Sequence, residues 1–124
     1  MAKKFQNYIG GKWVDSKTGR TFENRNPANW EELVGTFPLS NKEDVDQAVK
    51  AARKAFETWR LVPAPKRGDM LKKVGDLLTK YKEEIAEQMT REMGKVLLET
   101  RGDVQEGIDT AYYAASEGRR LFGH

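Results

Sequence analysis

The sequence of 124 residues contains no cysteine and a single histidine. Without cysteine, the chain can form no disulfide, no thiolate metal site and no cysteine nucleophile. The one histidine, His124, is the last residue, where no following neighbour orients its ring. We therefore expect no hydrolytic triad within this chain, because such a triad needs a positioned imidazole.

Long hydrophobic runs and a dominant charge sign are also missing. Nowhere do about 18 apolar residues follow one another, and the start, MAKKFQNYIGG, lacks the apolar core of a signal peptide. The 22 Lys and Arg residues are interleaved with 19 Asp and Glu residues, which gives a formal net charge of +3. We expect a soluble, cytoplasmic protein with no membrane and no nucleic-acid partner.

Residues 1–39 have the pattern of short strands separated by turns. Gly10 and Gly11 lie between apolar flanks in YIGGKWV, as in a tight hairpin turn. The segments TFEN and ELVGTF are typical of a second and a third short strand, with NPAN as the turn between them and Pro38 as the end.

Residues 40–124 have the pattern of three amphipathic helices. Ser40 and Glu43 have the spacing of a capping box at the start of the first helix, which must end by VPAP. A second helix is predicted from Pro65 to Gly94, and a third from Val96 to Leu121 with Gly123 as its stop. The apolar stripes are Val45, Ala48, Val49, Ala52, Phe56 and Trp59; Met70, Leu71, Val74, Leu77, Leu78, Tyr81, Ile85 and Met89; and Leu97, Val104, Ile108, Ala111, Tyr112 and Ala115.

The expected fold class is α+β, with short amino-terminal strands followed by these helices. Length indicates one ordinary domain, composed of a strand-and-turn region (1–39) and a three-helix region (40–124). The helices are long for so small a protein, and the strands supply few partners to cover their apolar faces. We therefore expect a natural continuation of the chain.

Local motifs give little direct chemistry. GGKW and MGKV lack the spacing of a phosphate-binding loop and are typical of a turn and a helix end. Glu99, Asp103 and Glu106 recur at helical spacing, as metal ligands do in helix bundles, but no Glu-x-x-His pair accompanies them, so a solvated face is favoured. The tryptophans at 13, 30 and 59 could stack on bases, although core packing is the favoured role.

The order of motifs is more informative than any one of them. The succession NYIGGKWV, TFENRNPAN, LVGTF, NKEDVDQAVKAARKAFETW, KRGDMLKKVGDLL, REMGKVLLETRGDV and YYA resembles the amino-terminal quarter of the NAD(P)-dependent aldehyde dehydrogenase superfamily. The resemblance implies that the strands and helices are the outer part of an α/β Rossmann-like cofactor domain, with the two regions together making one partial cofactor-binding domain.

The resemblance also implies an activity for the complete protein. Family members are homo-oligomeric oxidoreductases that oxidise an aldehyde substrate to a carboxylate with NAD or NADP. A cysteine thiolate attacks the aldehyde, an asparagine side chain helps to form the oxyanion hole, and a glutamate is the general base. All three lie beyond these 124 residues in the family, as do the residues that bind the cofactor. We therefore assign no catalytic and no cofactor-binding residue here, and expect this chain alone to be inactive and to bind no cofactor tightly.

One binding site of the family can be placed on this sequence. Several members hold a structural monovalent cation with backbone oxygens just before the Asn-Pro turn and an acidic side chain in the third helix. The resemblance places these ligands at Asn24, Arg25 and Asp103. Oxygen ligands suit a hard cation. The alternative is an ordinary turn and a solvated Asp103.

A second interpretation of the whole chain is a small non-enzymatic binding module for nucleic acid or a protein partner. Its strands and helices are reminiscent of a winged helix. Long helices disfavour it, because recognition helices are short and belong to a compact core.

Overall fold

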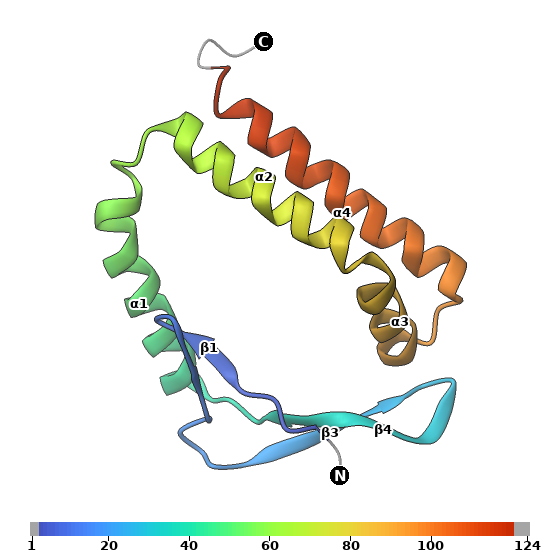
Figure 1. Cartoon of the computed structure of the whole chain (residues 1–124). Coiled ribbons are helices and arrows are strands. Elements are labelled where there is room, and N and C mark those ends of the chain that lie inside the picture. Colours follow the sequence, from blue (N-terminus) through green and yellow to red (C-terminus); the bar gives the residue numbers. More distant parts are fainter. Residues whose placement is uncertain (1–2, 121–124) are drawn as a thin grey trace. The chain divides into compact units, whose positions relative to one another are not determined.

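The computed structural model describes residues 3–120, which form four short strands followed by four helices (Figure 1). The expected α+β class is confirmed. The described residues pack as two compact units that divide between Leu61 and Val62. The first helix, α1 (Lys42–Trp59), contacts β1 (Asn7–Ile9) and belongs to the first unit, whereas the sequence-based regions divide after residue 39.

Some expectations fall on residues that the structure leaves undescribed. Leu121, Gly123 and His124, the expected helix end, helix stop and lone imidazole, lie outside the described residues. Within residues 3–120, no helix is long and apolar enough to cross a membrane.

The first unit begins with the expected hairpin. β1 pairs antiparallel with β2 (Lys12–Val14), and Gly10 and Gly11 between them have φ of 60° and 80°. Glycine adopts these angles without the steric cost that a side chain would bring. The rings of Tyr8 and Trp13, a cross-strand pair, lie 4.9 Å apart between centroids. The described strands number four rather than three, because each side of this turn forms its own strand.

A second hairpin follows. β3 (Thr21–Asn26) pairs antiparallel with β4 (Asn29–Pro38), so the Asn-Pro segment is the tight turn that the sequence predicts. The pairing register shifts at Asn24, Arg25 and Asn26, as it does at a β-bulge. Residues 3–5 run along the other edge of β4, where the Phe5 amide donates to the Thr36 carbonyl at 2.9 Å.

The capping box of α1 is one residue later than predicted. The Asn41 side chain accepts from the Asp44 amide at 3.2 Å, and the Asp44 carboxylate accepts from the Asn41 amide at 2.9 Å. The Ser40–Glu43 prediction is therefore wrong. The Ser40 hydroxyl instead accepts from the Asn7 side chain at 2.8 Å, which directs it to β1 and away from the helix.

The second unit contains α2 (Ala64–Lys80), α3 (Lys82–Met93) and α4 (Leu97–Glu117). The single helix predicted from Pro65 to Gly94 is therefore wrong, because the chain breaks at Tyr81, where φ is −103° and ψ is 18°. Gly94 ends α3 in the left-handed conformation, with φ of 76°, as expected.

α2 and α4 lie side by side along much of their length (Figure 1). Gly68 and Gly75 on α2 permit this close approach, because a side chain there would overlap the Ala115 carbonyl oxygen and the Tyr112 ring. The core of the unit lies where α3 meets α4, and its members are Ala86, Val104 and Ile108, with Leu78, Ile85, Met89 and Leu97 packed around them.

Candidate functional site

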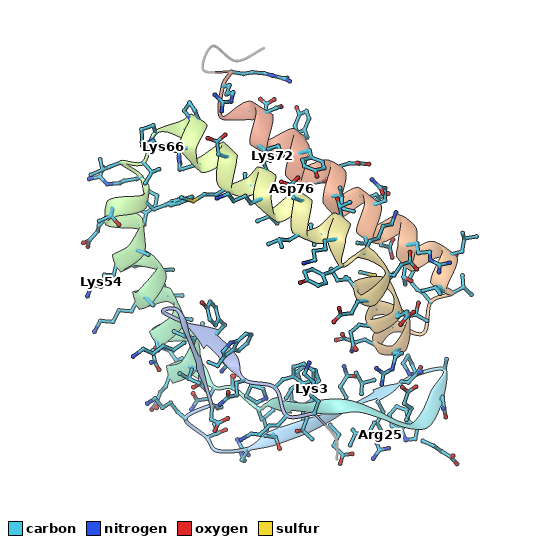
Figure 2. All side chains as sticks on the ribbon, viewed as in Figure 1. Lys3, Arg25, Lys54, Lys66, Lys72 and Asp76 are labelled. Carbon is cyan, nitrogen blue, oxygen red and sulfur yellow. The ribbon has the colours of Figure 1, made fainter. Side chains whose placement is uncertain are left out.

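Asn24 and Arg25 lie on the irregular part of the β3–β4 hairpin. The Arg25 guanidinium donates to the Glu23 carboxylate from Nη2 at 2.8 Å and from Nε at 3.1 Å, and to the Trp30 carbonyl at 3.2 Å (Figure 2). The positive charge of Arg25 is therefore neutralised within its own hairpin. A cation that bound the backbone oxygens here would meet a guanidinium already paired with a carboxylate.

Asp103 lies on α4, in the second unit. Its Oδ2 accepts a hydrogen bond from Lys95 Nζ at 2.6 Å, and the same ammonium lies 4.0 Å from Glu99 Oε2. The hydrogen bond to Asp103 raises the pKa of Lys95, and the charges of Asp103, Glu99 and Glu106 act in the same direction while burial opposes them. The ammonium of Lys95 is therefore the intramolecular counter-ion of this acidic face.

The three-carboxylate metal hypothesis for Glu99, Asp103 and Glu106 finds no support. Among the described residues, no group of three or more His, Cys, Asp or Glu side chains is placed to hold a metal ion. The hypothesis for Asn24, Arg25 and Asp103 is different, because two of its ligands are backbone oxygens. Asn24 and Arg25 lie in the first unit and Asp103 in the second.

Sequence reasoning missed the most extensive polar network of the first unit. Asp44 is buried and accepts hydrogen bonds from the Lys17 amide at 2.8 Å, the Ser16 hydroxyl at 2.7 Å and the Asn41 amide at 2.9 Å. These hydrogen bonds, the Lys17 amide first, hold the pKa of the Asp44 carboxyl below its ordinary value. The signal that could have found it is the Asn41-x-x-Asp44 spacing. The network ties the turn after β2 to the start of α1.

A second network lies between α2 and α4. Tyr112 donates a 2.8 Å hydrogen bond to Asp76, which also pairs with Lys72 at 3.1 Å (Figure 2). The Tyr112 hydroxyl and then Lys72 hold the pKa of the Asp76 carboxyl below its ordinary value. An ionised, doubly paired carboxylate is a poor general base, because general bases work best with a pKa near the operating pH.

An open groove of about 330 Å³ lies beside this network. Its wall includes the ion pair of Arg119 with Asp69, 2.9 Å between Nη2 and Oδ1, and its other residues are Gly68, Lys72, Tyr112, Ala115 and Ser116. Two cationic side chains of the groove, Lys72 and Arg119, pair with Asp76 and Asp69 of the same unit. The Arg119–Asp69 pair joins the first turns of α2 to the chain just after α4.

Large apolar side chains are more exposed than the sequence predicts. Trp13 is 66% and Trp30 72% exposed, so the prediction that these tryptophans close a core within this chain is wrong. Much of the predicted helix stripes is also exposed, namely Val45, Val49, Phe56 and Trp59 on α1 and Met70, Leu71, Val74, Leu77 and Tyr81 along α2. The apolar periodicity is therefore present, but the described residues cover only part of it.

This order of hairpins and helices, with its partly exposed apolar faces, is that of a known enzyme family. The chain belongs to the aldehyde dehydrogenase family, whose profile matches residues 13–124. It corresponds to an amino-terminal segment of that family and includes short strands that lead into the helices.

Individual relatives support the same conclusion. Malonate-semialdehyde dehydrogenase 1 of Geobacillus kaustophilus is 47% identical over 118 residues, which are 95% of this chain and 24% of that protein. Alpha-ketoglutarate semialdehyde dehydrogenase of Haloferax volcanii is 42% identical over 99% of this chain and 26% of that protein. The chain thus spans about a quarter of the length of the relatives that it matches.

Solved structures show the same fold. The NAD-dependent aldehyde dehydrogenase from Sinorhizobium meliloti matches with a TM-score of 0.92 and 35% identity, over 100% of this chain and 25% of that one. Betaine aldehyde dehydrogenase from Staphylococcus aureus, solved in complex with NAD+, matches with a TM-score of 0.86 and 33% identity, over 90% of this chain and 22% of that one. The predicted family is confirmed, and the binding-module interpretation is not needed to explain the chain.

Proposed function

We propose that the complete protein oxidises an aldehyde to a carboxylate with NAD or NADP. The observation that carries this proposal is the profile match over residues 13–124, together with 47% identity to a semialdehyde dehydrogenase. The aldehyde carbon loses a hydride to the nicotinamide, and water supplies the second carboxylate oxygen. The cysteine that family chemistry requires is absent from these 124 residues, so their role is to build part of the cofactor domain.

The test begins with the native gene product. Its intact mass, measured from its own host, shows whether it exceeds the 14.2 kDa of this chain. The purified product is then mixed with an aldehyde and NAD+ or NADP+, and formation of the reduced nucleotide is followed by absorbance. Turnover is expected from the complete protein and not from the chain of 124 residues. Turnover by neither would refute the proposed activity.

The substrate class that we propose is a semialdehyde, an aldehyde that also carries a carboxylate. The support is that the relatives named malonate-semialdehyde and alpha-ketoglutarate semialdehyde dehydrogenase both match nearly all of this chain. A neutral aldehyde of similar length is the control substrate. A higher kcat/KM for the semialdehyde is expected, and equal values would contradict the proposal.

We further propose that the backbone oxygens of Asn24 and Arg25 and the carboxylate of Asp103 bind a structural monovalent cation in the complete protein. All of these donors are oxygens, which hard cations prefer. The melting temperature should rise in KCl relative to tetramethylammonium chloride at equal ionic strength, and Asp103→Asn should remove that rise. Equal melting in the two salts would refute the site.

The remaining proposals concern assembly and location. We propose that residues 1–39 and 40–124 together form one partial cofactor-binding domain, and that the complete protein is a cytoplasmic homo-oligomer without nucleic-acid or membrane partners. Light scattering of the complete protein tests the oligomeric state, and fractionation of its host tests the location. A monomeric mass or a membrane-bound fraction would contradict these proposals.

A further inference from the structure

One face of α2 carries exposed apolar side chains at regular spacing. They are separated by four, three and four residues, and each is between 43% and 54% exposed: Met70, Val74, Leu77 and Tyr81. Alternating spacings of four and three are those of the side chains that meet where two helices pack in a coiled-coil manner. We call this set the apolar seam of α2.

The helix α4 packs against a different face of α2. The contact runs along Gly68 and Gly75, where an added Cβ would meet Ala115 and Tyr112. At 3.6 residues per turn, these glycines lie about 140° around the helix from the centre of the apolar seam. Another segment can therefore pack on the seam while the α2–α4 contact stays intact.

A row of three exposed lysines borders the apolar seam. Lys66, Lys73 and Lys80 recur every seven residues, which is nearly two helical turns, so they lie along one side of α2. Each lysine is three or four residues from a member of the seam, the spacing at which helical side chains are neighbours. Lys80 Nζ lies over the Tyr81 ring, 5.0 Å from its centroid.

The carboxylates of α2 that are nearest to this lysine row in sequence are engaged elsewhere. Asp69 pairs with Arg119 at 2.9 Å. Asp76 accepts from Tyr112 at 2.8 Å and pairs with Lys72 at 3.1 Å. Within residues 3–120, no carboxylate forms an ion pair with a member of the lysine row. The positive charge of the row is therefore available to carboxylates of another segment.

We propose that the apolar seam is the docking face for an amphipathic helix from the remaining polypeptide of the complete protein, and that Asp or Glu side chains of that helix meet the lysine row. The spacing of the seam suits a helix, and the lysine row determines which edge of that helix is acidic. The chain spans about a quarter of the length of its relatives, so a protein of that length has ample polypeptide to supply the helix. The inference requires the complete protein to be longer than this chain, but it does not depend on the proposed substrate or cofactor.

A second copy of the chain is a poorer partner for this face. A two-fold pairing presents the same surface on both molecules. Each lysine row would then meet apolar side chains or the other lysine row, and no carboxylate of the seam would neutralise it. Like charges that face one another across an interface oppose association.

The test uses the native gene product and a water-soluble carbodiimide, which joins a lysine amine to a carboxylate in direct contact with it. Mass spectrometry of the digested protein identifies the linked residues. We expect links from the lysine row to Asp or Glu side chains beyond residue 124 of the same polypeptide. A mixture of unlabelled and nitrogen-15-labelled protein separates links within one polypeptide from links between copies.

The chain offers two controls for the cross-linking. Lys73→Arg keeps the positive charge, but a guanidinium is not coupled by the reagent, so the link at position 73 should disappear while links from Lys66 and Lys80 remain. The pair of Lys72 and Asp76, 3.1 Å apart within α2, is the internal reference. A link between them shows that the reagent reaches this helix.

Oxidation of Met70 by hydrogen peroxide tests the apolar part of the face separately. Met70 is 50% exposed among the described residues, so an uncovered seam leaves its thioether open to the reagent. Beneath a docked helix, Met70 of the folded complete protein should be oxidised at least about fivefold more slowly than Met70 of the same protein unfolded in urea.

Several results would overturn the proposal. Links from the lysine row only to residues 1–124, or only between copies, would show a different occupant. No links from the row, although Lys72 and Asp76 are linked, would show that no acidic edge lies there. Oxidation of Met70 at nearly equal rates in the folded and unfolded protein would show that the seam is uncovered, and a native product of 14.2 kDa would lack the proposed helix. The cross-linking and oxidation results are independent of aldehyde turnover, so the proposed activity stands or fails separately.

Discussion

Ser16 donates a 2.7 Å hydrogen bond to the carboxylate of Asp44, which follows it by 28 residues in the sequence. The Lys17 amide donates to the other oxygen of the same carboxylate at 2.8 Å. One buried acidic side chain thus joins a turn to the first turn of α1. The hydrogen-bond donors around Asp44 favour its ionised form. Protonation of Asp44 should therefore weaken the connection between this turn and α1.

This relationship predicts a pH dependence. The pKa of Asp44 is lower in the folded chain than in the unfolded chain, where it is about 4. The ionised Asp44 carboxylate therefore contributes fully to folding stability above about pH 4. The contribution is lost as the pH falls through the folded pKa. We expect Asp44→Asn to melt below the unmodified chain at neutral pH, and the difference to shrink on acidification. A difference that grows at low pH would contradict the role of Asp44.

The cap of α1 can be tested by itself. Asn41→Ala removes the side-chain oxygen that accepts from the Asp44 amide, and should lower the free energy of unfolding by about 1 kcal/mol. Ser40→Ala is the comparison for the neighbouring hydroxyl, which does not cap α1 and accepts from the Asn7 side chain. Urea unfolding followed by circular dichroism measures both. No loss of stability in Asn41→Ala would contradict the role of Asn41 as the cap of α1.

The close approach of α2 and α4 predicts the effect of a single methyl group. Gly68→Ala would place its Cβ against the Ala115 backbone oxygen, and should cost about 1–3 kcal/mol through overpacking. Gly107→Ala on α4 is the matched control, because nothing lies within 4 Å of the added atom. It should stabilise the helix by up to about 1 kcal/mol. Equal effects of the two substitutions on urea unfolding would disprove the tight contact.

A pair of threonine hydroxyls in the second unit, one of them buried, predicts that the effects of two substitutions on the free energy of unfolding are not additive. Thr100 is fully buried, and its Oγ1 lies 2.8 Å from Thr90 Oγ1. Thr100→Val leaves the Thr90 hydroxyl without that partner and should cost about 1–3 kcal/mol.

The double variant Thr90→Val, Thr100→Val should lose less stability than the two single variants added together, because both hydroxyls are removed. A double-mutant cycle by urea unfolding measures the coupling. Strict additivity would show that the two hydroxyls act independently.

The exposed stripe of α2 predicts association of the isolated chain. Val74 and Leu77 are among its exposed apolar side chains, and extensive exposed apolar surface favours self-association. Leu77→Lys should reduce the concentration-dependent increase in sedimentation coefficient, whereas Thr110→Lys, at an exposed position of α4, should not. A chain that sediments as a monomer at all concentrations would contradict this prediction.

The sequence predicts local features well where a single residue type determines the backbone conformation. Gly10 and Gly11 indicate a hairpin turn because they tolerate positive φ, and Gly94 indicates a helix end for the same reason. The Asn-Pro segment similarly marks the turn between β3 and β4. These features depend on few neighbours, so a single sequence contains the necessary information.

Features that depend on packing are harder to predict. The break at Tyr81 does not interrupt the apolar periodicity, because Leu78, Ile85 and Met89 all pack around the same core, and periodicity alone predicts one long helix. The contact between Lys95 and Asp103 depends on the loop after Gly94, which no local pattern specifies. The candidate cation ligands came from family resemblance. The pairing of Lys95 with Asp103 could be found only in the folded structure.

Each of the two units is made of one continuous segment of the chain, so each can fold as soon as that segment has been synthesised. Contacts within the first unit join residues up to Leu61, and those of the second unit join residues from Val62 onward. In a protein of the relatives' length, synthesis of the remaining three quarters takes about 20 to 75 seconds at elongation rates of about 5 to 20 residues per second. Throughout that interval the exposed apolar stripe of α2 would stay accessible to solvent on a nascent chain, and exposed apolar surface of this kind favours association.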